Sequence, residues 1–136
     1  MITARTKARK RALDILFAAE AQGIAATDLL DERIASGDLG NSYTADLVRG
    51  VAAHAVQIDE LLSTYSRDWP LERMPAVDRN VLRLGVFELL AGPEDVPSHV
   101  AISEAVELSQ SLSTDESPQF VNGVLGAIER DKPSLG

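Results

Sequence analysis

Apolar residues recur at helical spacing along almost the whole chain, and this periodicity restricts the fold more than any other feature. Leu, Ile, Val and Ala return every third or fourth residue, and no segment alternates apolar and polar residues as a half-buried strand would. Aromatic residues make up only 4% of the chain, so the core must be built from aliphatic side chains, which suit packed helices. The sequence therefore predicts an all-α fold.

Capping residues mark the first two predicted helices. Thr3 is a suitable N-cap and Gly23 a suitable stop for a basic helix over about residues 3–21. A second, short helix is predicted over 27–35, with Ile34 among its buried residues.

Proline and serine punctuate the rest of the chain. One long central helix is predicted to start at Ser42 and to end before Trp69–Pro70, because its apolar stripe is unbroken through Tyr65. Three further helices are expected to begin at Pro75, at a Ser98 cap and at Ser117. The connections between them are short, so we expect a compact orthogonal bundle of about six to seven helices.

Length and composition indicate one ordinary domain over residues 1–136, with a frayed tail over about 131–136. A chain of this size buries roughly two-thirds of its unfolded surface in one core. The absence of cysteine excludes disulfides and thiolate metal sites, and it indicates a reducing, cytoplasmic compartment. Neither a signal peptide nor a membrane-spanning stretch is evident, so no membrane association is expected.

Charge is distributed very unevenly. Residues 12–136 carry 8 basic and 21 acidic groups, whereas residues 1–11 have no acid and five basic residues: Arg5, Lys7, Arg9, Lys10 and Arg11. Basic groups four residues apart on a helix, as Arg5 and Arg9 are, can follow the phosphates of one nucleic-acid strand. The alternative is a solvated basic start without a specific partner, and composition leaves both open.

The sequence contains no arrangement that indicates catalysis. It lacks a glycine-rich phosphate loop, a nucleophile elbow and paired histidines at metal spacing. His54 lies within the apolar stripe of the central helix, where a partly buried structural histidine is the simpler interpretation. We therefore expect neither an enzyme nor a bound cofactor or metal.

The last predicted helix places Phe120 and Asn122 two residues apart near its start. Helical residues two apart do not share a face, so one of them should point away from the core. An exposed ring near a basic patch could stack on an unpaired base. The alternative, which periodicity alone favours, is that Phe120 belongs to the core.

Four segments resemble the NusB family of transcription antitermination factors: Arg5–Phe17, Val81–Leu89, Val96–Leu108 and Phe120–Leu125. The last two, in this order and at this distance, are specific together. The resemblance implies two packed helical halves and no catalytic activity. It also implies binding to the boxA element of nascent single-stranded RNA together with NusE, a small-subunit ribosomal protein, on the RNA polymerase elongation complex with other Nus factors.

The resemblance also assigns roles to residues. Thr6 interrupts what is often an unbroken arginine run, so one phosphate contact is either missing or supplied by Lys10 or Arg11. The NusE contacts carry over to Phe17 and Asp78, the latter standing where a longer glutamate is common. The expected RNA-binding set is Arg5, Lys7, Arg9, Lys10, Arg11, Glu116, Phe120 and Asn122.

Two alternatives to an RNA-binding factor remain. Some family members form homodimers, and a homodimeric structural module would cover the basic helix. The same helical domain also resembles the N-terminal part of certain ribosomal-RNA cytosine methyltransferases, although this chain has no cysteine to attack a pyrimidine.

Overall fold

The computed structural model describes residues 3–67 and 69–135, which form seven α-helices, one short 3₁₀ helix and no strand. The all-α prediction is confirmed. None of the described helices is long and apolar enough to cross a membrane. The helices are α1 (Ala4–Gln22), α2 (Ala26–Ala35), α3 (Ser42–Ala53), α4 (Ala55–Tyr65), α5 (Ala76–Ala91), α6 (Ser98–Leu112) and α7 (Ser117–Asp131), with the 3₁₀ helix η1 (Leu71–Arg73) between α4 and α5.

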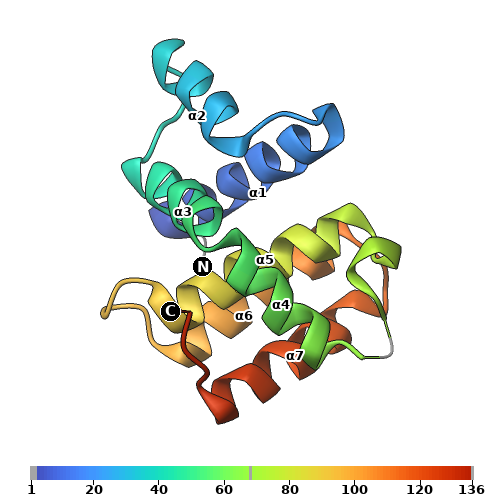
Figure 1. Cartoon of the computed structure of the whole chain (residues 1–136). Coiled ribbons are helices and arrows are strands. Elements are labelled where there is room, and N and C mark those ends of the chain that lie inside the picture. The colour runs from blue at the N-terminus through green and yellow to red at the C-terminus, as the bar shows by residue number, and fades with distance from the viewer. Residues whose placement is uncertain (1–2, 68, 136) are drawn as a thin grey trace.

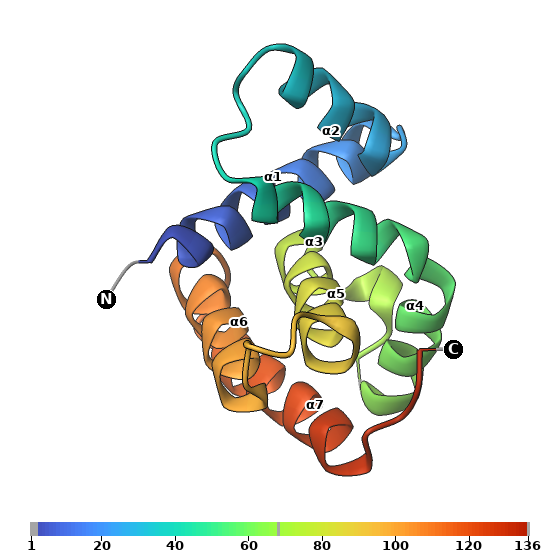
Figure 2. The same ribbon diagram turned by 90° about the vertical axis from the view of Figure 1, so that its left-hand side faces the viewer.

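The helices form two halves, α1–α3 and α4–α7, with α3 leading directly into α4 (Figure 1). Helix α5 is the centre of the bundle, since it packs against α1, α3, α4, α6 and α7. In the turned view, α1 lies across the α5–α6 side of the second half (Figure 2). The basic first helix packs on α2 and α3 of its own half and on α5 of the second half.

Both predicted ends of α1 are confirmed. The side-chain oxygen of Thr3 accepts a hydrogen bond from the backbone N–H of Thr6 at 3.0 Å. Gly23 adopts the left-handed conformation, with φ of 69°, and its N–H bonds to carbonyls of the last turn. The cap expected at Ser98 is wrong, because Ser98 is the first helical residue after Pro97 and no side chain caps α6.

The prediction of a single long central helix is also wrong, because this segment forms two helices, α3 and α4. The chain bends at His54, which lies between α3 and α4 with φ of −113° and ψ of 19°. The half-buried His54 ring stacks on Phe87 of α5, with ring centroids 6.3 Å apart. Phe87 also packs so closely on Gly50 that a Cβ there would lie 2.1 Å from a ring carbon. Packing against α5 therefore accompanies a bend at His54, a residue that is neither glycine nor proline.

Two burial expectations differ from the structure. Helix α2 packs on α1 and α3 and buries Leu29 and Leu30 as expected, whereas Ile34 is 41% exposed. Near the C-terminus, Leu135 is 6% exposed and belongs to the core, although Asp131, Lys132 and Ser134 before it are exposed.

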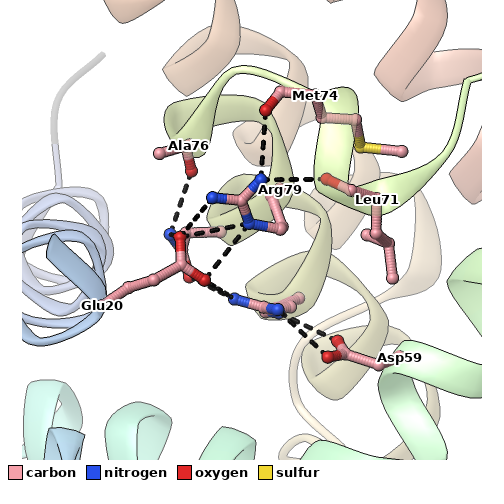
Figure 3. A network of polar contacts seen from close by, with 8 residues as sticks. Glu20, Asp59, Leu71, Met74, Ala76 and Arg79 are labelled. Atoms are coloured by element: carbon pink, nitrogen blue, oxygen red, sulfur yellow. Dashed lines mark hydrogen bonds and ion pairs between the residues drawn. The ribbon is translucent and has the colours of Figure 1, made fainter. Parts of the chain in front are cut away.

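A polar network joins the C-terminal end of α1 to the second half (Figure 3). Glu20 accepts hydrogen bonds from Arg79 and Arg83 of α5, and Arg83 also donates to both oxygens of Asp59 on α4. Arg79 donates as well to two backbone carbonyls in the segment before α5. The network fixes the end of α1 relative to α4 and α5.

This network predicts an acid-sensitive contribution to stability. Partial burial alone would raise the pKa of Glu20, but hydrogen bonds from Arg79 and Arg83 outweigh it and lower that pKa from 4.5 to about 2. A depressed folded-state pKa stabilises the protein fully above the unfolded value, and this contribution is lost as the pH falls from 4.5 toward 2. Glu20→Gln should therefore lower the urea midpoint near neutral pH, and its difference from wild type should shrink below about pH 4. A difference that stays constant in an acid series followed by circular dichroism would contradict this assignment.

Candidate nucleic-acid interface

Three exposed cations occupy the first half of α1: Lys7, Lys10 and Arg11. The side chains of Lys7 and Lys10 form no hydrogen bond or ion pair with another described residue, and the two residues are three positions apart on one helical face. Arg11 remains exposed while donating to the backbone carbonyl of Asp38 at 2.9 Å. The two lysines are therefore available to bind an anion without breaking an internal contact.

Arg5 lies two residues before Lys7 on α1, and its side chain already contacts other residues. Its guanidinium donates to Asp95 at 3.1 Å and lies 4.6 Å from the centroid of the Tyr43 ring. The Asp95 side chain is 70% exposed, so its ion pair with Arg5 is screened by solvent and weak. An anionic ligand could replace Asp95 while Tyr43 keeps the guanidinium oriented.

Arg9 departs from its expected role as a phosphate contact, because its side chain is only 4% exposed. It donates to both oxygens of Glu88, at 2.7 and 2.9 Å, and to Glu104 at 3.0 Å. Tyr43 donates a further hydrogen bond to Glu88 at 2.6 Å. Burial alone would lower the pKa of Arg9, but the hydrogen bond and charge of Glu88 outweigh it and raise that pKa. Arg9 thus binds α1 to α5 and α6 from the inside and does not face solvent.

The ridge formed by Lys7 and Lys10 has a hollow on each side. One, of about 300 Å³, lies between α1 and the segment after α2, and Arg11 and Arg33 contribute further positive charge to its wall. The other, of about 320 Å³, lies between α1 and α6. Both lysines line both hollows, so a strand bound along the ridge would have space on either side.

The start of α7 carries the other expected RNA contacts. Glu116 and Asn122 are exposed, whereas Phe120 is half-buried and packs partly against the core. Its ring meets Trp69 edge-on, with centroids 4.8 Å apart and planes at 70°. Asn122 is therefore the residue of this pair that points away from the core, and Phe120 packs partly against the core, closer to the alternative expectation. Trp69, the chain's single tryptophan, was not among the expected site residues, and only its rarity pointed to it.

The two expected partner residues have different environments. Phe17 is 40% exposed on α1 and can contact a partner directly. Asp78 is fully buried at the start of α5, where one carboxylate oxygen accepts a hydrogen bond from Ser117 at 2.8 Å. Its other oxygen has no hydrogen-bond partner in the described part of the chain. A direct partner contact from Asp78 does not fit this position, which instead ties α5 to the start of α7.

Comparisons with known proteins agree with the fold. The model of the NusB family matches residues 6–130. The transcription antitermination protein NusB of a Nocardioides species is 64% identical over 135 residues, covering 98% of this chain and 99% of that protein. The solved structure of T. maritima NusB is 34% identical, with a TM-score of 0.84, and the match covers 96% of this chain and 94% of that one. A solved complex of antitermination factors NusB and NusE with double-stranded RNA contains a chain that is 27% identical, with a TM-score of 0.81 and coverage of 96% and 99%. On this sequence and structural similarity, the chain belongs to the NusB family.

Proposed function

We propose that this protein is a transcription antitermination factor that binds boxA-type single-stranded RNA together with NusE. The observation that carries the proposal is that Lys7 and Lys10 project from α1 without a partner for either side chain among the residues that the structure describes. The chain after residue 11 is strongly acidic. An acidic body discourages unspecific coating of nucleic acid and favours one binding orientation. The solved relative bound to NusE and RNA supports both partners.

Within this proposal, the RNA backbone contacts Lys7 and Lys10, with Arg5 and Arg11 at the edges of the ridge. Phe120, beside Trp69, offers an aromatic surface to a base, and Glu116 and Asn122 lie at the rim of that site. Phe17 is the proposed NusE contact. The proposed setting is the RNA polymerase elongation complex with other Nus factors, in the cytoplasm.

The direct test is RNA affinity measured by fluorescence anisotropy on a short boxA-like single strand, with and without purified NusE at constant salt. NusE should tighten binding about tenfold or more, which corresponds to a coupling of about 1.4 kcal/mol. If the protein binds RNA neither alone nor with NusE, the proposal fails. A homodimeric module that covers α1 then becomes the better hypothesis. Sedimentation with and without RNA would then show the self-paired species.

Lys7 and Lys10 should account for a measurable part of the salt dependence of RNA affinity. With roughly three to five phosphates engaged, the slope of log affinity against log salt should be about −2 to −3.5 for a single strand. Lys7→Gln combined with Lys10→Gln should weaken binding about tenfold and make the slope shallower by about 1.4, because two phosphate contacts are lost. The matched control is Arg49→Gln with Arg130→Gln, which removes two exposed charges from α3 and α7. Equal effects of the two double variants would mean that net charge, and not the ridge, determines affinity.

A further inference from the structure

The hollow between α1 and α6 has an apolar floor and charged rims. Leu108 and Leu112 of α6 form the floor, and Leu112 is 40% exposed although it is a large aliphatic residue. The volume of about 320 Å³ lies at the low end for ligand pockets, so it suits one small planar ring system and not an extended ligand.

The two rims carry opposite charge. Lys7 and Lys10 line the α1 side, and Glu104 and Glu107 line the α6 side. Glu104 is already engaged, because one of its oxygens accepts hydrogen bonds from Thr6 at 2.7 Å and from Arg9 at 3.0 Å. Glu107 is exposed, and its carboxylate has no hydrogen bond or ion pair with another described residue. It is therefore a free acceptor across the hollow from two free cations.

We propose that this hollow receives one unpaired base that presents an exocyclic amino group, from the RNA strand whose phosphates bind Lys7 and Lys10. A carboxylate accepts a hydrogen bond from such an amino group, as acidic side chains do with cytosine. Uracil presents carbonyl oxygens on both sides of its single N–H. These partially negative oxygens would repel the negatively charged carboxylate of Glu107. The apolar floor covers the face of the base, and the lysines hold its backbone. This inference rests on the proposed RNA-binding function and adds base selectivity to it.

The test removes only the amino group from the ligand. The probes are labelled octamers of adenosine and of purine riboside, which differ by the exocyclic amino groups and keep the same stacking rings. Wild type should bind the adenosine octamer roughly three- to tenfold more tightly, because a hydrogen bond to a charged acceptor at a solvent-open rim has a modest net effect. In Glu107→Gln that ratio should fall toward unity, since an amide at this position is no longer a charged acceptor. Glu60→Gln, which removes an exposed acid on α4, is the matched control and should keep the wild-type ratio.

A second variant tests the floor. Leu112→Ala should weaken binding of both octamers by roughly threefold and leave their ratio unchanged, because it removes apolar contact and no hydrogen bond. Val56→Ala, at a 67% exposed aliphatic residue of α4, should change neither affinity. Circular dichroism and thermal melts establish that all four variants are folded.

The possible outcomes distinguish failure of the base site from failure of the proposed RNA-binding function. If wild type binds boxA-like RNA but does not distinguish the octamers, or if Glu107→Gln keeps the wild-type ratio, the base site is wrong and the RNA-binding function stands. If wild type binds no RNA with or without NusE, both the base site and the RNA-binding function are wrong. A ratio that drops in Glu107→Gln alone establishes the site.

Discussion

Replacing Arg9 with methionine should destabilise the protein by about 3–5 kcal/mol, because the change leaves a buried carboxylate without its counter-charge. Glu88 is 5% exposed and receives two hydrogen bonds from Arg9. Methionine fills similar space but donates no hydrogen bond, and the remaining donor to Glu88, the hydroxyl of Tyr43, carries no charge. Urea unfolding followed by circular dichroism near neutral pH measures the loss.

Arg5 provides the matched control, since it is one turn away on the same helix and its ion pair with Asp95 is exposed. Arg5→Gln should change stability by less than about 1 kcal/mol. A combined Arg9→Met and Glu88→Met variant should recover part of the loss, because a buried ion pair replaced by apolar groups is often close to neutral. If Arg9→Met is as stable as Arg5→Gln, the buried network does not hold α1 on the bundle.

Replacing Phe120 with alanine should weaken RNA binding by about 1–3 kcal/mol if its ring stacks on a base. The ring is half-buried against Trp69, so alanine also removes packing and will lower stability. Affinity must therefore be measured by anisotropy under conditions where the variant is folded. Trp69 supplies a second signal, because it is the chain's only tryptophan and its emission should respond to a base placed on the neighbouring ring.

Phe120→Leu separates stacking from packing. Leucine keeps an apolar side chain against Trp69 but has no π-face, so stability should largely recover while RNA affinity stays low. If Phe120→Leu binds RNA as wild type does, Phe120 has only a structural role and the aromatic part of the site must lie elsewhere.

The features that the sequence predicted well depend on neighbouring residues. The start and end of α1 follow from Thr3 and Gly23, whose capping and left-handed conformations are properties of the residue type. The uneven charge was likewise visible in the sequence, and of its five basic residues Lys7, Lys10 and Arg11 are exposed in the structure, whereas Arg9 is buried. Family membership required longer segments, but these too could be read directly from the chain.

The features that could not be predicted depend on residues far apart. Nothing near Arg9 distinguishes it from Lys7 or Lys10, because its partners Glu88 and Glu104 lie 79 and 95 positions later. The bend at His54 has the same origin, since the apolar stripe continues through it and packing on α5 accompanies the turn. Asp78 gave the same difficulty, as its burial against Ser117 requires the start of α7 to be in place.

Helix α1 is pinned to the second half near both of its ends, by Arg9 on one side and by Glu20 on the other. The cationic ridge is therefore preassembled, and an incoming strand has no helix to order. Segments that fold on binding show a large negative change in heat capacity and lose part of their binding energy to ordering. Calorimetric titration of this protein with RNA should accordingly give a small heat-capacity change, set by the contact area alone, and an enthalpy that varies little with temperature.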